Sequence, residues 1–219
     1  MAGGKSLSGV VIGSIIEVRF AYSGKISSLR IHSGDLVKSG SPLAELDKKI
    51  LQAELDKELA DYERVRADFE IFVKKAGTAQ DDFAKFEKVE RQALLNSSVK
   101  SVEISKYRLD QTVMFSPVRG IVVDDGGLRV GIYATPGANP VKILDLDSLA
   151  LSVPVSWEQI NEFGSDIQFS VRIEDGEKSI PAALLPFIPT VGPKEKPELR
   201  FRISPDFPVY PTMSGVVEY

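Results

Sequence analysis

The sequence predicts an elongated α+β protein in which an antiparallel pair of long helices interrupts one β-rich unit and a second β-rich unit follows. Three observations predict this fold. Helix-breaking residues are nearly absent from the middle of the chain, apolar residues recur there at helical spacing, and glycines recur at similar spacings on both sides of that region.

The helical hairpin is predicted over residues 48–113. No proline and a single glycine, Gly77, occur between residues 43 and 116. Because glycine and proline are the residues that most often end helices, we expect two helices that meet at Gly77. Residues 48–110 hold 13 basic and 13 acidic side chains in mixed order, which is typical of helices with solvent-exposed faces.

Both helices carry apolar residues at the three- and four-residue steps of a coiled coil. The two stripes are Leu51, Leu55, Leu59, Tyr62, Arg66, Phe69 and Val73 in the first helix, and Phe83, Phe86, Val89, Ala93, Leu95, Val99, Val102, Lys106, Leu109 and Val113 in the second. The step from Ala93 to Leu95 breaks the register and predicts a local distortion. Since no third amphipathic helix is predicted, a bundle core is disfavoured. The hairpin should instead project from the body by about 42 to 50 Å, at 1.5 Å per residue.

The segments on either side of the hairpin resemble each other. Their glycines are Gly24, Gly34 and Gly40, spaced by 10 and 6 residues, and Gly120, Gly131 and Gly137, spaced by 11 and 6. Each segment consists of short Ile, Val and Leu strands between glycine turns and is too short to bury its own apolar face. We therefore expect the two halves to pack as one small sandwich, with the hairpin inserted between them.

Residues 149–219 are predicted to form a second, all-β unit, a small barrel or sandwich. Apolar residues alternate over 149–155, where Pro154 suggests a sheet edge or a bulge. Residues 15–20 also alternate and are expected to add an N-terminal strand to this unit. The remaining expected elements are a short capped helix over 156–163, strands over 167–173, 179–185, 199–203 and 214–219, and a proline-rich loop over 189–197.

The composition excludes several classes of function. The chain has 219 residues, no cysteine and one histidine, so disulfides, thiolate metal sites, a cysteine nucleophile and a multi-histidine zinc site are excluded. Its 27 basic and 31 acidic residues give a net charge of −4, which argues against nucleic-acid binding. No run approaches the roughly 20 apolar residues of a membrane helix. Residues 1–5 look like a cloning remnant or a cut end, which is compatible with the loss of a native anchor or signal. No catalytic, metal or cofactor site is predicted.

Several short motifs occur in a fixed order over about residues 15–219. They are 23–26 (SGKI), 33–40 (SGDLVKSG) and 43–47 (LAELD) before the hairpin, and 116–122 (SPVRGIV), 146–149 (LDSL), 153–163 and 211–217 (PTMSGVV) after it. In this order, with a hairpin splitting the first β-rich unit, they resemble the membrane fusion proteins, the periplasmic adaptors of bacterial tripartite efflux pumps and type I secretion systems.

The resemblance implies four domains. Residues 1–20 would supply one or more N-terminal strands to a β-barrel, 21–47 and 115–148 would form a lipoyl/biotinyl-like β-sandwich, 48–113 an α-helical coiled-coil hairpin, and 149–219 the barrel. The implied role is non-catalytic. The β domains dock on an inner-membrane transporter, the hairpin reaches an outer-membrane channel protein, and several copies associate into a ring or funnel. We expect a periplasmic location, with anchoring to the inner membrane by a segment missing from this sequence.

The residues predicted to bind a partner are those of the hairpin tip. They are Lys74, Lys75, Ala76, Gly77, Thr78, Ala79 and Gln80. Members of the family often carry an Arg, a Leu and a Ser near the tip, whereas this chain has Asp68, Phe72 and Ala79 at the corresponding positions. The tip contacts of the family are therefore not carried over to this chain.

One alternative function is that of a lipoyl or biotinyl carrier domain. Asp47 and Lys48 follow a lipoyl-like half, and true lipoyl carriers modify the lysine of an Asp-Lys turn. Two features disfavour this function for Lys48: a long insertion separates the two halves, and the lysine falls in the first turn of a helix. Biotin is disfavoured further because no methionine flanks the lysine.

The remaining polar motifs have structural interpretations. We expect His32, Gly126-Gly127, Asp81-Asp82 and Asp124-Asp125 in turns or helix caps, and the sequon at Asn96 within a helix. The three methionines are too scattered for a copper or silver site. Arg66, inside the apolar stripe, is either a register-setting polar residue or a contact between copies of the chain.

Overall fold

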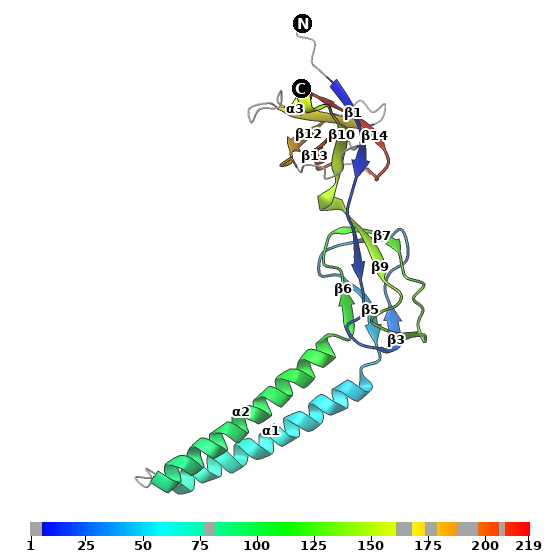
Figure 1. Ribbon diagram of the computed structural model, residues 1–219. Coiled ribbons are helices and arrows are strands. Elements are labelled where there is room, and N and C mark those ends of the chain that lie inside the picture. The colour runs from blue at the N-terminus through cyan, green and yellow to red at the C-terminus, as the bar shows by residue number, and fades with distance from the viewer. Residues whose placement is uncertain (1–5, 77–81, 161–167, 174–178, 188–196, 206–208) are drawn as a thin grey trace.

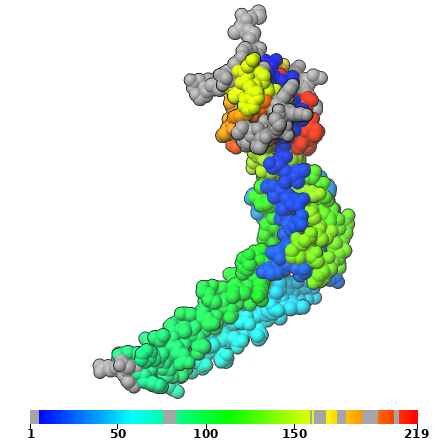
Figure 2. Space-filling model, viewed as in Figure 1, coloured from blue at the N-terminus to red at the C-terminus, as the bar shows by residue number. Residues whose placement is uncertain are grey.

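The computed structural model describes residues 6–76, 82–160, 168–173, 179–187, 197–205 and 209–219. Figure 1 shows three parts in a row: a first β unit, a second β unit in the middle, and a helical hairpin that leaves the middle unit at an angle. In the space-filling view the hairpin stands clear of both β units along most of its length (Figure 2). Within the described ranges, no helix is both long and apolar enough to cross a membrane.

The two predicted helices are present as α1 (Lys49–Ala76) and α2 (Asp82–Asp110), which pack against each other in antiparallel directions (Figure 1). They have 28 and 29 residues, so each is about 42 Å long at 1.5 Å per residue. At the start of α1 the Asp47 carboxylate accepts a hydrogen bond of 3.0 Å from the Lys49 backbone N–H. In its last turn Lys74 and Lys75 complement the negative end of the helix dipole.

The middle unit contains two four-stranded sheets, with strand orders β2-β9-β7-β4 and β6-β5-β3-β8. The strands are β2 (Ile15–Val18), β3 (Gly24–Leu29), β4 (Leu36–Val37), β5 (Pro42–Leu46), β6 (Val113–Phe115), β7 (Gly120–Asp124), β8 (Tyr133–Ala134) and β9 (Val141–Asp145). Each sheet combines strands from before and after the hairpin, and the two sheets share one core that includes Ile26, Leu43, Val122 and Ile143. The two glycine-spaced segments are therefore complementary halves of one unit.

The first β unit is a closed six-stranded barrel with strand order β1-β10-β13-β12-β11-β14. Its elements are β1 (Ser6–Ile12), β10 (Ala150–Pro154), β11 (Phe169–Ile173), β12 (Ser179–Leu184), β13 (Glu198–Ile203) and β14 (Ser214–Glu218), together with the 3-10 turn η1 (Leu146–Ser148) and the short helix α3 (Trp157–Ile160). Strict alternation along β13 places Leu199, Phe201 and Ile203 in the barrel core. The suggested edge or bulge at Pro154 is wrong, because this proline ends β10 opposite Glu198 in a closed barrel.

The assignment of residues 1–20 to the barrel is wrong for its second half. β1 lies between β10 and β14 of the barrel, whereas β2 pairs with β9 in the middle unit. The strands separate at Gly13 and Ser14, where the chain passes closely between the two units: a Cβ on Gly13 would lie 2.9 Å from Leu144 Cδ1. Ser14 fixes this passage, because its N–H donates to Ser148 Oγ at 2.8 Å and its C=O accepts from the Asp145 N–H at 2.9 Å.

Some predicted elements fall partly outside the described residues. The capped helix predicted over 156–163 is described only as Trp157–Ile160. Residue 167 of the strand predicted over 167–173 and most of the proline-rich loop, residues 189–196, also lie outside the described ranges. The other barrel strands agree with the predicted ones to within one residue at each end that can be compared.

The hairpin begins and ends on neighbouring strands of one sheet. β5 and β6 pair antiparallel with Glu45 opposite Val113, and the Leu46 N–H donates to the Thr112 C=O at 2.9 Å. Thr112 is 1% exposed, and its hydroxyl donates to the Leu109 C=O at 2.7 Å. Because the two strands already lie side by side, the insertion of the hairpin needs no long loop at its base.

Gly120→Ala tests the close approach of β7 and β9. A Cβ at this position would lie 2.2 Å from the Leu144 carbonyl oxygen, so the substitution should lower the free energy of unfolding by about 1–3 kcal/mol. Gly137→Ala is the matched control, because nothing lies within 4 Å of its added Cβ, and it should change stability by less than about 0.5 kcal/mol. Urea unfolding followed by circular dichroism measures both, and equal effects would contradict the packing described.

Candidate functional site

The far end of the hairpin is the predicted partner-binding site. Lys74 and Lys75 lie in the last turn of α1, and both side chains are exposed. Ala76 is the last residue of that helix, and its side chain is not described. Four of the predicted tip residues, Gly77, Thr78, Ala79 and Gln80, lie outside the described ranges. The described part of the tip is therefore a pair of solvated ammonium groups at the end of α1.

The inner face of α1 follows the predicted stripe only in part. Leu51, Tyr62 and Phe69 are half-buried and Leu55 is buried, as expected. At the other three steps the contact falls one position earlier than predicted. Glu58, Val65 and Phe72 are half-buried. The predicted Leu59, Arg66 and Val73 are exposed. A straight helix has 3.6 residues per turn, so the contact line moves across the surface as it follows a neighbouring helix.

The stripe predicted at the start of α2 is wrong. Phe83, Phe86, Val89 and Ala93 are exposed and do not form the inner face. Nor does the helix divide at Ala93, since α2 is continuous from Asp82 to Asp110. The break in the apolar pattern marks the point where the apolar residues change faces of one regular helix.

The inner face of α2 is instead built from polar, small and a few apolar side chains. Its half-buried or buried residues at coiled-coil steps are Glu87, Arg91, Leu95, Ser98, Val102, Ser105 and Leu109. Of these, Leu95, Val102 and Leu109 agree with the predicted stripe.

An arginine links the two helices in the half near the tip. The Glu87 carboxylate accepts two hydrogen bonds from Arg91, of 3.1 Å from Nε and 2.7 Å from Nη2. The same guanidinium lies 4.7 Å from the centroid of the Phe72 ring on α1, within the range of a cation–π contact. Phe72, at a position where the family often has a tip residue, thus belongs to the contact between the helices.

Arg66 does not set the register of this contact. Its side chain is exposed and its Nε donates to Glu70 Oε1 on the same helix at 2.9 Å. This hydrogen bond with Glu70 raises the pKa of the Arg66 guanidinium, which stays charged. A contact between copies of the chain through Arg66 remains a prediction.

A polar groove follows one flank of the hairpin and was not anticipated from the sequence. It has a volume of about 430 Å³ and is lined on α1 by Asp61, Arg64 and Asp68, and on α2 by Ser97 and Ser101, among others. Asp68 is another of the positions where members of the family often have a tip residue, and here it lines this groove. The spacing of these polar residues follows the helical period, but the sequence did not show which flank they would share.

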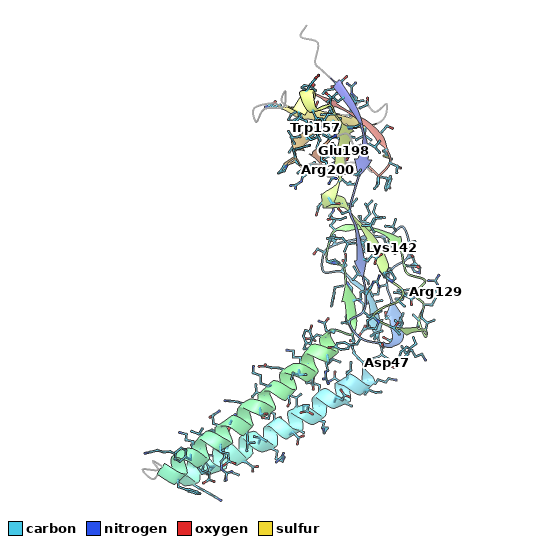
Figure 3. The ribbon with its side chains drawn as sticks, viewed as in Figure 1. Asp47, Arg129, Lys142, Trp157, Glu198 and Arg200 are labelled. Atoms are coloured by element: carbon cyan, nitrogen blue, oxygen red, sulfur yellow. The ribbon has the colours of Figure 1, made fainter. Side chains whose placement is uncertain are left out.

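Lys48 lies at the base of the hairpin, immediately before α1. Its ammonium group binds Glu45 Oε1 at 2.8 Å, and its C=O accepts the Gln52 N–H at 2.8 Å in the first turn of the helix. Asp47, labelled in Figure 3, caps that turn. This arrangement holds the lysine against a sheet strand and a helix start, unlike the tight exposed turn that a swinging arm needs.

The turns of the middle unit hold the other polar motifs. The His32 N–H donates to Asp35 Oδ2 at 2.8 Å while its ring is exposed, as expected for a turn histidine. Asp124 receives the Gly126 N–H at 2.9 Å and lies 3.2 Å from Lys142 Nζ, and these two contacts lower the pKa of its carboxyl. Gly126 adopts a φ of 66° in a turn, and no helix directly follows this segment to point its N-terminus at a phosphate.

Comparison with known proteins identifies the fold. The sequence matches no known family profile and no curated protein. Among solved structures, a candidate efflux transporter from Bacteroides eggerthii is 18% identical, with 98% of this chain and 68% of that chain covered and a TM-score of 0.82. A MacA–MexA chimera that contains the Pseudomonas aeruginosa MexA α-hairpin domain is 19% identical, with 98% and 80% covered and a TM-score of 0.75.

The membrane fusion protein Spr0693 from Streptococcus pneumoniae is 16% identical, with 98% of this chain and 97% of that chain covered and a TM-score of 0.72. Since both chains are covered almost completely, the three parts occur in the same order in both. The resemblance to membrane fusion proteins inferred from the short motifs is thus confirmed for the fold.

Leu55→Ala and Leu59→Ala test the inner face of α1. Leu55 is 8% exposed and Leu59 is 39% exposed, although both lie on the predicted stripe. Removal of the Leu55 side chain should destabilise the hairpin by about 2–3 kcal/mol, because a buried leucine leaves a cavity. The Leu59 variant should lose less than about 1 kcal/mol. Helical circular dichroism during thermal unfolding distinguishes them, and a larger loss for Leu59→Ala would contradict the observed face.

Proposed function

We propose that this protein is the non-catalytic adaptor subunit of an efflux or secretion assembly, linking an inner-membrane transporter to an outer-membrane channel across the periplasm. The observation that carries the proposal is a rod of two helices, each about 42 Å long, that is rooted in a β-sandwich and supported by no other element of the described chain (Figures 1 and 2). Such a rod lengthens the molecule without enlarging its hydrophobic core, which suits a subunit that links two other proteins.

We assign the two β units to the end of the bridge that meets the inner-membrane transporter. We assign the middle unit as a lipoyl-like sandwich split by the hairpin, and with the barrel it provides a broad surface for a transporter. We further infer that the protein is held at the inner membrane. Several copies would associate into a ring or funnel around the transported cargo.

Within the described ranges there is no group of three or more His, Asp or Glu side chains that could hold a metal ion. The backbone N–H of His32, the single histidine, donates to Asp35 Oδ2 of its own turn, and its ring is exposed. The names of the similar structures, an efflux transporter candidate and a membrane fusion protein, support transport as the setting.

Charge reversal at the tip tests the bridging role. In the native host, a strain lacking the gene should lose transport, and the wild-type gene should restore it. The variant Lys74→Glu/Lys75→Glu should restore transport at least tenfold less well, because two repulsive charges would face the channel. Each reversal should cost the helix less than about 1 kcal/mol through the dipole.

The matched control is Lys106→Glu, which reverses an exposed charge on α2 far from the tip. It should support normal transport. Normal transport by the tip variant, with unchanged crosslinking to the channel, would show that the tip is not the contact.

Intact mass distinguishes the adaptor from a carrier domain. Protein made in a host able to attach lipoate and biotin should have its unmodified mass, because Lys48 is bonded to Glu45 beside a helix start. A lipoyl or biotinyl adduct that disappears in Lys48→Arg would overturn the adaptor assignment.

A further inference from the structure

A cavity lies where the middle unit meets the barrel, away from the hairpin. Its volume is about 530 Å³, within the range of about 300–1,000 Å³ that is usual for small-molecule sites. Three segments line it: the β4–β7 edge of the middle unit, the turn η1, and the stretch of chain that follows β13. Figure 1 shows the narrow junction of the two units at which these segments meet.

The middle unit contributes an apolar wall. β4 is the edge strand of its sheet, and Leu36 pairs there with Ile121 of β7. Paired residues point to the same face of a sheet, and the next residue of a strand points to the opposite face. Val37 is 6% exposed and faces the core, so Leu36 and Ile121 are turned outward to the cavity that both line. Leu36 is 65% exposed, and a ligand that covered it would remove apolar surface from water.

The opposite wall comes from the barrel. The Ile203 N–H donates to the Leu149 C=O at 3.1 Å, which holds the chain after β13 beside the end of η1. Beyond it, Pro205, Val209 and Tyr210 line the cavity. Tyr210 is 44% exposed and offers both an aromatic ring and a hydroxyl group. A ligand in the cavity would therefore lie between two walls that are mainly apolar.

Two oppositely charged side chains, Arg119 and Asp147, also line the cavity. The Leu146 N–H donates to the Arg119 C=O at 3.1 Å, so the residue before Asp147 is bonded directly to the segment that carries the arginine. In the part of the chain that the structure describes, neither the guanidinium nor the carboxylate has an ion-pair or hydrogen-bond partner. Both charges are thus available to a ligand at the rim of an apolar cavity.

This combination favours a ligand that carries both charges on an apolar body. A guanidinium binds a carboxylate through two parallel N–H donors, and a carboxylate binds an ammonium group. A ligand with a negative charge alone would be repelled by Asp147, and a ligand with a positive charge alone by Arg119. In a dipeptide with free termini the two charged groups are about 5–6 Å apart, which suits two side chains on neighbouring segments.

We propose that this cavity binds a short apolar peptide with free termini. Its carboxylate binds Arg119, its ammonium group binds Asp147, and its side chains cover Leu36, Ile121 and Tyr210. The inference does not depend on the proposed function, because it involves neither the hairpin nor a protein partner. Since the bound peptide would contact both the middle unit and the barrel, it should stabilise the folded chain.

Calorimetric titration of the whole chain tests the ligand class. The probes are the dipeptide Leu-Phe and the tripeptide Leu-Leu-Phe, each with free termini, with an acetylated N-terminus, or with an amidated C-terminus. The free peptides should bind about fivefold or more tightly than either blocked form, because each blocked form lacks one charge-assisted contact. Absence of binding at millimolar peptide would overturn the proposal. So would equal binding of all three forms.

Two variants assign the charges to the two ends of the peptide. Arg119→Gln should weaken binding of the free peptide about fivefold or more and leave binding of the amidated form unchanged. Asp147→Asn should do the same for the free and the acetylated forms. Arg129→Gln is the matched control, since this exposed arginine of the middle unit lies outside the cavity (Figure 3) and should leave all affinities unchanged. An equal loss for every form of the peptide would contradict the assigned orientation.

The apolar wall has its own test. Leu36→Ser should weaken binding of the free peptide about fivefold, because less apolar surface is then covered by the ligand. Val123→Ser is the control, since Val123 is 50% exposed on β7 but does not line the cavity. Both substitutions are at exposed positions, so circular dichroism should show an unchanged fold. Equal affinities of the two variants would show that the peptide does not lie against β4.

Discussion

The pairing of β5 with β6 is the interaction on which the rest of the structure depends. It places the point where the chain leaves the sandwich beside the point where it returns, and the hydrogen bond from Leu46 to Thr112 extends that pairing to the first turn of the hairpin. A strand pair fixes direction as well as position, so the helices inherit their angle to the sandwich from a sheet (Figure 1). A flexible linker at the same place would let the hairpin change its angle to the sandwich, and the position of the hairpin tip would then not be fixed.

The sequence predicted the elements more successfully than their faces. Helix breakers have large local effects, so the gap between Pro42 and Pro117 located both helices closely. Apolar spacing, in contrast, shows that a face is apolar but not which neighbour it meets. In α2 the outer face near the tip is more apolar than the inner face, so the pattern pointed to Phe86 where the structure uses Arg91. The same limit applies at Gly13, because residues 15–20 alternate as a barrel strand would, yet β2 pairs in the middle unit while β1 pairs in the barrel.

The composition of the helix contact inside the hairpin has an energetic consequence. Inside the hairpin, Ser98 and Ser105 and the Glu87–Arg91 pair occupy positions where leucine would bury far more apolar area. At about 25 cal/mol per Å² of apolar surface, such a contact is weak for its length. The larger side chains, Phe86 and Tyr107 among them, lie on the outer face and are exposed in the single chain. The hairpin therefore holds together as a single chain while much of its apolar surface stays exposed.

This fold permits wide divergence in sequence, since the similar solved structures are only 16–19% identical to this chain at TM-scores of 0.72–0.82. The features that this fold requires are the strand pairing at the base, the length of the hairpin and a closed barrel. Many combinations of residues can satisfy each of these requirements. Recognition is more restrictive, and this chain differs at two positions where membrane fusion proteins often carry tip residues: Phe72 lies against Arg91 between the helices, and Asp68 lines a groove. Two of the positions that often recognise a channel are thus used for other contacts. Under the proposed bridging role, the exposed ammonium groups of Lys74 and Lys75 in the last turn of α1 favour a partner surface that is acidic.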